Sequence, residues 1–320
     1  MNGNTDQDRR TGIWYAIGAY ATWGILPLYW HTLEEIPALE ILAHRIWWSF
    51  LSVALILLFM NRWSLLKQAF QDKKSRNAIF LASVLITLNW FTYIWAVNAG
   101  HVIDASLGYY INPLFSILLG VFFLKERLNF WQVVSLLMAA IGVCLITVQY
   151  GKIPWVAFLL TVTFGLYGLA KKLIRVDSMV GLTLETTMMM PLALIYILYV
   201  QARGIGSLGA ISFSTLALLM GTGIVTVFPL FWFAQGAKRV SLSTIGFIQY
   251  LSPTISLLLG IFVFKEAFTW ANMVCFGFIW VALLIFSLSH TPFMKEFQPK
   301  FFKKSHSVRV GDCQQNHRHS

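Results

Sequence analysis

Ionisable residues stand inside long apolar runs of this sequence. Glu40 and His44 are four residues apart, so on a helix they share one face, and Arg45 follows directly. Glu185 lies near the start of another apolar run, and the dipeptide Leu-Glu occurs in both runs. If these runs cross a membrane, such groups usually face a bundle interior or a cavity. A carboxylate and an imidazole on one face could relay a proton or bind a cationic group.

Two structural explanations of the same residues stay open. Glu40, His44 and Arg45 could neutralise one another, or they could lie close enough to the membrane surface to reach water. Glu185 has no evident basic partner in its own run, and it too could lie at an interface.

Two prolines, Pro113 and Pro253, lie near the middle of apolar runs. A proline inside a helix removes one hydrogen bond and disturbs the carbonyl four residues earlier, here that of Tyr109 and that of Gln249. Interruptions at matching positions of two halves indicate a binding site at the membrane midplane. The polar and aromatic candidates around these prolines are Tyr109, Tyr110, Asn112, Gln249, Tyr250 and Ser252. Packing kinks without ligand contact are the alternative.

The segment NWFTYIWAVNAGH, residues 89–101, carries further candidates. Asn89 and Tyr93 share a helix face, whereas Asn98 points to the opposite side of a straight helix. Asn89 is the better candidate for binding a solute, and a hydrogen bond between helices is its alternative. Trp90 could stack on an aromatic solute, although interfacial belts and lipid packing explain most membrane tryptophans.

The elements that carry these residues are apolar segments of membrane-spanning length. The chain is 58% hydrophobic and 12% charged, which is too apolar for a soluble domain. A bilayer core needs about 20 apolar residues for each helical span. Ten spans are predicted, at 12–30, 38–60, 78–98, 103–124, 130–149, 154–170, 181–201, 214–235, 243–264 and 270–289.

Lysine and arginine are distributed unevenly among the connections. The two termini and the loops after spans 2, 4, 6 and 8 hold 20 of these residues, and the intervening loops hold three. Because basic residues of short loops stay in the cytoplasm, both termini are predicted there. Membrane topology thus explains the net charge of +11, and no nucleic-acid partner is expected.

An internal repeat links the two halves of the chain. YINPLFSILLGVFFLKE at 110–126 and YLSPTISLLLGIFVFKE at 250–266 share nine of 17 positions, including the proline, one glycine and the final Lys-Glu. Five crossings separate these segments, so the halves enter the membrane from opposite sides. The prediction is an all-α polytopic membrane protein of ten transmembrane helices in two inverted five-helix repeats. Such halves can alternate between two arrangements around a central site.

The predicted organisation has four parts. Residues 1–11 form a cytoplasmic N-terminus, 12–149 the first repeat, 150–290 the second, and 291–320 a basic cytoplasmic tail that we expect to be mostly disordered.

Sequence motifs for other chemistry are missing. Cys144, Cys275 and Cys313 have neither CxxC spacing nor a nearby histidine partner, so neither a disulfide framework nor a metal site is expected. The sequence has no Walker loop, HExxH pair or GxSxG turn, and no cofactor is expected.

Four segments resemble the RarD-type permeases, also called chloramphenicol-sensitive proteins, of the EamA branch of the drug/metabolite transporter superfamily. They are PALEILAHR at 37–45, NWFTYIWAVNAGH at 89–101, SLGYYINPL at 106–114 and GFIQYLSPT at 246–254. The resemblance covers roughly residues 12–288. It implies ten helices in two EamA repeats, a site in the cavity between the halves, and transport by exchange or an ion gradient. It assigns neither a substrate nor a role to any single residue.

The expected function is secondary-active transport of a small organic solute, a metabolite or an amphipathic drug-like compound, across a bacterial inner membrane by alternating access. The expected partners are this solute, membrane lipids and, as one possible coupling ion, protons; a homodimer is one arrangement left open. The alternatives are a membrane-embedded enzyme or lipid scramblase that uses Glu40 and His44 as acid and base, and an assembly factor without transport activity.

Overall fold

The computed structural model describes residues 2–60, 63–98, 102–150, 155–263, 270–289, 291–297 and 299. All regular elements of these residues are helices, as the composition predicts. In chain order they are α1 (Asn2–His31), α2 (Ala38–Phe59), α3 (Trp63–Gln71), α4 (Lys73–Asn98), α5 (Val102–Leu124), α6 (Phe130–Tyr150), α7 (Trp155–Leu173), α8 (Ser178–Ala202), η1 (Ser207–Gly209), α9 (Phe213–Arg239), α10 (Leu242–Gln249), α11 (Leu251–Phe262), α12 (Trp270–Leu288) and α13 (Pro292–Glu296).

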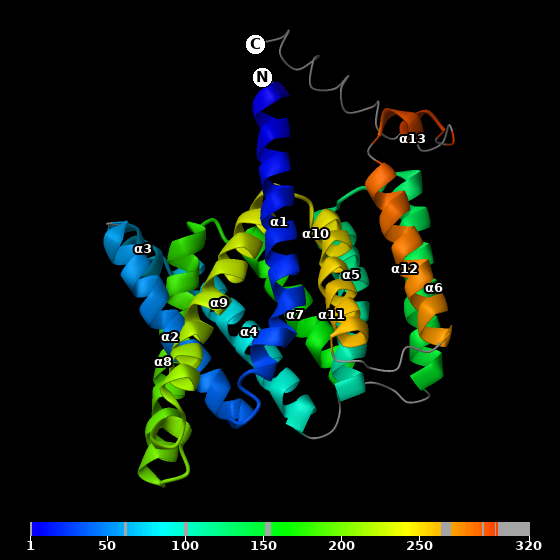
Figure 1. The fold of residues 1–320 in the computed structure, drawn as a ribbon. Coiled ribbons are helices and arrows are strands. Elements are labelled where there is room, and N and C mark those ends of the chain that lie inside the picture. The colour runs from blue at the N-terminus through cyan, green and yellow to red at the C-terminus, as the bar shows by residue number, and fades with distance from the viewer. Residues whose placement is uncertain are drawn as a thin grey trace, which may run out of the picture. The chain divides into compact units, whose positions relative to one another are not determined.

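The chain forms two compact units. The larger comprises Met1–Leu124 with Ile153–Ala267, and the smaller comprises Lys125–Lys152 with Phe268–Ser320. In the larger unit α1 packs against α9 and α11, α2 against α8 and α9, and α5 against α7 and α10, while α4 packs against α7. In the smaller unit α6 and α12 lie side by side (Figure 1).

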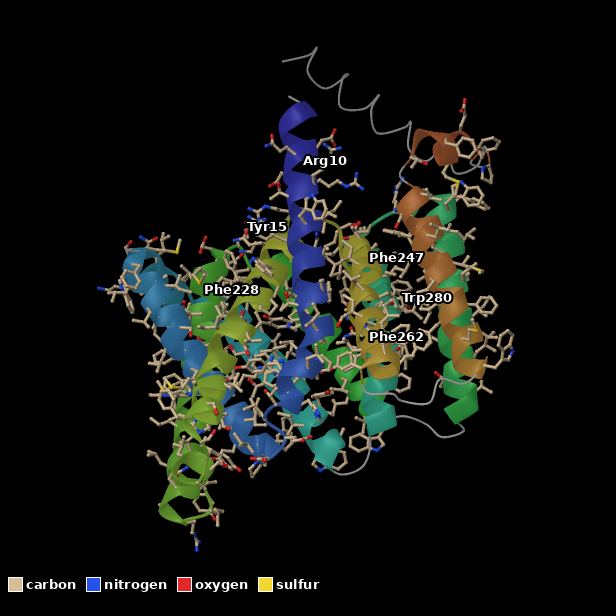
Figure 2. All side chains as sticks on the ribbon, in the orientation of Figure 1. Arg10, Tyr15, Phe228, Phe247, Phe262 and Trp280 are labelled. Carbon is tan, nitrogen blue, oxygen red and sulfur yellow. The ribbon has the colours of Figure 1, made fainter. Side chains whose placement is uncertain are left out.

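The outward faces of the helices are apolar. Phe228 on α9 is 47% exposed and Phe262 on α11 is 67% exposed, whereas Phe247 on α10 is buried (Figure 2). Such a surface is suited to lipid rather than water. Among the described helices, six are long and apolar enough to cross a membrane: α2, α4, α7, α8, α9 and the run formed by α10 and α11. The chain is therefore a multi-pass helical membrane protein.

A helix occupies the expected loop between the second and third spans. Residues 63–71 form α3, in which Trp63, Leu66 and Phe70 alternate with polar residues at helical spacing. Nine residues are too few to cross a bilayer, so this segment is not predicted as a membrane span. A short amphipathic helix of this kind suits the membrane surface. The tail begins with another short helix, α13, and nearly all of the tail after it lies outside the described residues.

The two matching prolines have different effects on their helices. The ninth predicted span is divided at Tyr250 into α10 and α11, and α10 ends at Gln249, whose carbonyl the ring of Pro253 leaves without its usual partner. Around Pro113, in contrast, α5 is continuous, and the interruption expected there is absent. A membrane helix tolerates a proline where neighbouring helices support it, and α7 and α10 pack along α5.

Two glycines allow close helix crossings. A Cβ atom on Gly246 would lie 2.7 Å from the carbonyl oxygen of Pro113, so α10 crosses α5 at that point. A Cβ atom on Gly223 of α9 would come even closer, 2.4 Å, to the backbone carbonyl carbon of Trp48 on α2. Small residues at such crossings bring membrane helices into direct backbone contact.

Candidate functional site

Arg45 lies in a cage of aromatic rings. It is in the third turn of α2, about 10 Å along the helix from its start. Its Cζ atom is 4.1 Å from the ring centre of Trp90 on α4 and 5.2 Å from that of Trp30 on α1. Its Nε donates a hydrogen bond of 2.7 Å to Oγ1 of Thr226 on α9. Four helices of the larger unit thus meet at one guanidinium group.

Two tyrosines complete the surroundings of this cation. Tyr93 on α4 and Tyr109 on α5 interact electrostatically with Arg45, and their rings meet edge to face at 5.8 Å. Tyr109 lies deep among the helices, yet 42% of its surface is accessible. Arg45 itself is half-buried. The cation and its aromatic neighbours are therefore partly accessible.

No carboxylate neutralises Arg45 within the described part of the chain. The expectation that Arg45 could pair with Glu40 is therefore wrong, because the guanidinium turns toward Trp90 and Thr226 instead. The aromatic rings and one hydroxyl offset only part of the free-energy cost of a charge within a membrane.

Glu40 and His44 are buried, 1% and 2% exposed, so neither reaches water at an interface. Oε1 of Glu40 accepts a 2.7 Å hydrogen bond from the backbone N–H of Ser207, and Oε2 accepts one of 2.9 Å from its hydroxyl. His44 Nε2 is 4.0 Å from Oε1, and both ring nitrogens lack a hydrogen-bond partner. Glu40 thus fastens the start of η1, in the connection between α8 and α9, to the start of α2.

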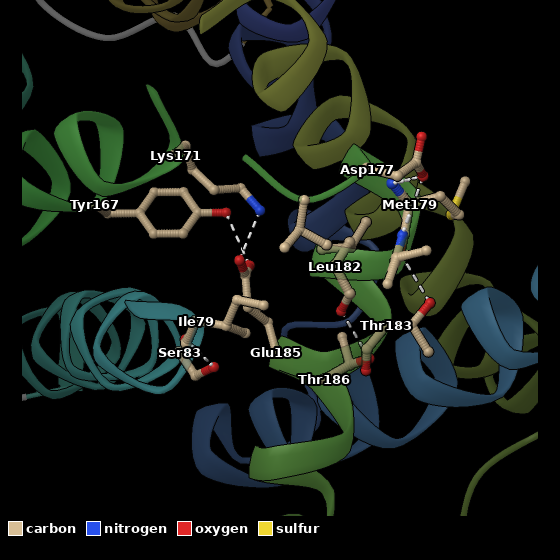
Figure 3. Close-up of polar contacts among 12 residues, drawn as sticks. Ile79, Ser83, Tyr167, Lys171, Asp177, Met179, Leu182, Thr183, Glu185 and Thr186 are labelled. Carbon is tan, nitrogen blue, oxygen red and sulfur yellow. Dashed lines mark hydrogen bonds and ion pairs between the residues drawn. The ribbon is translucent and has the colours of Figure 1, made fainter. Parts of the chain in front are cut away.

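Glu185 forms a buried ion pair with a neighbouring helix. Lys171 of α7 donates a 2.6 Å hydrogen bond to Oε1, and the hydroxyl of Tyr167 donates one of 3.2 Å to Oε2 (Figure 3). Both charged side chains are at most 4% exposed. The basic partner that Glu185 lacks in its own helix comes from α7 instead. The predicted span ends at residue 170 and leaves Lys171 in a loop, but α7 continues to Leu173 and encloses it.

A small cavity lies between Trp90 and Glu185. Its volume is 20 Å³, enough for about one water molecule. Ser49 and Ile46 of α2 line it, together with residues of α4, α8 and α9. Trp90, which covers Arg45, and Glu185 of the buried ion pair both line this cavity. Residues from both halves of the sequence line it.

Asn89 makes helix-to-helix hydrogen bonds. Its Nδ2 donates 2.9 Å bonds to the carbonyl of Leu160 and to the hydroxyl of Thr163, both on α7. The side chain is 8% exposed. These contacts are hydrogen bonds between helices, which is the structural alternative to solute binding for Asn89. The side chain of Asn98 lies outside the described residues.

The residues near the prolines form a second polar cluster in the larger unit. Oε1 of Gln249 accepts long hydrogen bonds from the hydroxyls of Tyr20, at 3.4 Å, and Ser116, at 3.5 Å. Oδ1 of Asn112 and the hydroxyl of Tyr250 are buried without partners.

Close packing surrounds this second cluster. Pro113 and Pro253 are buried, and Pro113 lies against Gly246. Tyr110 is half-buried on α5. The cluster joins α1, α5 and α10, but the cage of Arg45 has more accessible surface.

Several residues of the site are absent from the sequence-based candidates. Thr226 and Trp30 contact Arg45, Ser207 binds Glu40, and Tyr167 and Lys171 bind Glu185. Tyr167 and Lys171 are four residues apart, so their shared helix face is a usable signal. The other contacts join distant parts of the chain and leave no local pattern. In the described residues no group of three or more metal-binding side chains occurs.

Comparisons with known proteins give consistent results. The sequence profile described as the EamA-like transporter family matches residues 10–148 and again residues 152–288. The uncharacterized transporter YojE of Bacillus subtilis (strain 168) is 49% identical over 285 residues, which cover 88% of this chain and 95% of YojE. Protein RarD of Escherichia coli (strain K12) is 40% identical over 277 residues, covering 87% of this chain and 94% of RarD.

Protein RarD of Streptomyces exfoliatus is similar to a comparable degree, at 39% identity over 280 residues, 88% of this chain and 89% of that protein. One crystal structure with 20% sequence identity matches the fold with a TM-score of 0.69, over 89% of this chain and 99% of the other. That likeness concerns the fold alone.

Proposed function

Because the chain belongs to the EamA-like transporter family, as a RarD-type permease, we propose that it is a secondary-active transporter of a small organic solute. The observation that carries this proposal is the group of charged and aromatic side chains around Arg45, enclosed by helices of membrane-spanning length. Ionisable groups are unfavourable inside a membrane protein and usually mark the path of a solute or an ion.

We propose ten spans in two inverted halves, with both termini in the cytoplasm. Three observations support this arrangement: the 140-residue repeat, the two consecutive matches to the family profile, and the uneven distribution of basic residues. α2 and α8 each place a charged residue about 10 Å from the start of the helix, Arg45 in α2 and Glu185 in α8. In the proposed topology these two helices start on opposite sides of the membrane.

Polar contacts at both ends of the larger unit suggest how access alternates. At the proposed external end, Glu40 binds Ser207 and the hydroxyl of Tyr29 donates to the carbonyl of Leu218. At the proposed cytoplasmic end, Lys171 binds Glu185 and Lys238 donates to the carbonyl of Val176. With both sets formed, the cavity between Trp90 and Glu185 has a volume of 20 Å³. We interpret this conformation as closed at both ends, and opening one end breaks one set.

The proposed solute site comprises Arg45 with Trp90, Tyr93 and Tyr109, because these side chains meet at one cation and Tyr109 remains partly accessible. Glu185 and its partner Lys171 are the proposed site of coupling, whether to protons or to exchange. A solute that reaches the cavity lies between Trp90 and Glu185. If the solute displaces Lys171 from Glu185, solute binding is directly coupled to this charged pair.

The proposal is tested by exchange in proteoliposomes, which does not require the solute to be chosen in advance. Vesicles that contain the purified protein and an isotope-labelled cell extract are placed in unlabelled extract, and released compounds are identified by mass spectrometry. A pH-sensitive dye inside the vesicles reports coupled proton movement. We expect one or a few solutes to leave faster than from protein-free vesicles. If folded protein releases none, secondary transport of a soluble solute is contradicted.

A further inference from the structure

We propose that Arg45 binds the carboxylate of an organic acid, so that the transported solute is an anion with an apolar or aromatic body. This inference rests on the proposed transport function. From the sequence, Glu40 and His44 could relay a proton or bind a cationic group, and Arg45 is a candidate beside them. The contacts around each charged group favour an anion at Arg45.

Among the described residues of the larger unit, the buried carboxylates have partners, whereas the half-buried Arg45 has no ionic partner. Glu185 has Lys171 at 2.6 Å, and Glu40 accepts two hydrogen bonds from Ser207. Arg45 forms no ion pair with any described carboxylate. A guanidinium stays protonated in proteins, so it cannot become neutral to avoid the cost of burial. The missing group is therefore an anion, and a solute can supply it.

The guanidinium is also free to donate hydrogen bonds. It has five N–H groups, and within the described residues only Nε has a partner, the hydroxyl of Thr226. Arg45 is half-buried, so part of its side chain stays accessible. The planar fork of its N–H groups matches the two oxygens of a carboxylate. Thr226 fixes the opposite edge of the group and thereby orients the fork.

The surroundings of Arg45 select the rest of the solute. Trp90 and Trp30 cover the guanidinium at 4.1 and 5.2 Å, and these rings offer apolar surface beside the charge. The hydroxyls of Tyr93 and Tyr109 can donate hydrogen bonds to an anion. An organic acid uses both features, whereas a small hydrated inorganic anion uses only the second. The adjacent 20 Å³ cavity holds about one water molecule, so the helices separate when the solute enters.

The test compares matched acids, amides and amines as ligands of the detergent-solubilised full chain. The probes are propionate, phenylacetate and indoleacetate, with propionamide, phenylacetamide, indoleacetamide, propylamine, phenethylamine and tryptamine. Binding is measured as the shift of the melting temperature with ligand concentration. We expect the acids with aromatic bodies to stabilise the wild-type protein more than their amides and amines. Arg45→Gln should weaken that binding by about 10- to 100-fold, as expected for loss of a charged hydrogen-bonding partner.

Two further variants separate binding from structure. Arg203→Gln is the matched control, because Arg203 lies over the ring of Tyr199 at 5.5 Å, outside the cage. It should bind the acids as the wild type does. Arg45→Lys keeps the charge but loses the fork, so its affinity should fall between those of wild type and Arg45→Gln. A cation without a counter-ion contributes little to stability, and Arg45→Gln should melt near the wild-type temperature in the absence of ligand.

The outcomes also separate this inference from the proposed function. Preference for amines or amides, or unchanged acid binding by Arg45→Gln, overturns the role of Arg45. If no probe binds, the solutes released in the proteoliposome exchange decide the question. Released solutes without an acidic group overturn the inference while transport stands. Acidic solutes whose release requires Arg45 support it, and release of no solute contradicts the transport proposal itself.

Discussion

Loss of the lysine in the Lys171–Glu185 pair should destabilise the protein. Lys171→Met leaves a carboxylate that is 4% exposed, with the hydroxyl of Tyr167 as its remaining donor. Removing one partner of a buried ion pair costs about 3–5 kcal/mol.

We therefore expect Lys171→Met to lower the free energy of unfolding by about 3–5 kcal/mol at pH 7. The double variant Lys171→Met/Glu185→Gln has no unpaired charge, and it should be more stable at pH 7 than Lys171→Met by at least about 1 kcal/mol. Lys67→Met changes an exposed lysine of α3 and should stay within about 0.5 kcal/mol of wild type.

The assay is equilibrium unfolding in mixed micelles of increasing denaturing-detergent content at pH 7, followed by tryptophan fluorescence. If Lys171→Met is as stable as the wild type, the ion pair does not hold α7 to α8. A double variant less stable than Lys171→Met would equally refute the reasoning.

Three further predictions use other contacts of the larger unit. Gly246→Ala should lower the free energy of unfolding by about 1–3 kcal/mol, since the new Cβ would lie 2.7 Å from the Pro113 carbonyl; Gly181→Ala, with no atom within 4 Å, should be neutral in the same assay. Ser207→Ala removes one hydrogen bond to Glu40. It should increase proteolytic cleavage between α8 and α9, and unchanged cleavage would show that this bond does not restrain the connection. Asn89→Ala should cost about 0.5–2 kcal/mol through its lost bonds to α7, and wild-type stability would contradict that contribution.

The sequence predicts the helices well because their signal is local. Apolar runs of about 20 residues locate the long helices, and Pro253 explains the end of α10 at Gln249. Hydropathy does not predict the end of a helix where that end depends on contacts with other helices. The apolar run ends before Lys171 and so predicts a loop there, but a partner on α8 keeps this residue within the helix. Pro113 predicts an interruption of its helix, which packing against neighbours prevents.

The candidate site is only partly visible in the sequence. Arg45 and Trp90 are both candidates, yet nothing in their spacing shows that one covers the other. Thr226 is 181 residues from Arg45, and Ser207 is 167 residues from Glu40. Such contacts arise from tertiary packing, so the sequence indicates which groups are charged but not which are left without a partner. That difference decides which charged group is proposed to bind the solute.

The central claim is that the protein moves an organic acid through a site that contains Arg45. The most direct measurement is an untargeted comparison of solutes inside and outside cells that lack the protein, overproduce it, or overproduce Arg45→Gln. We predict that at least one organic acid changes its distribution in opposite directions on deletion and overproduction, and that Arg45→Gln behaves like the deletion. No redistribution of any solute, with the protein folded in the membrane, would contradict the transport account. Redistribution confined to neutral or cationic solutes would contradict the role of Arg45.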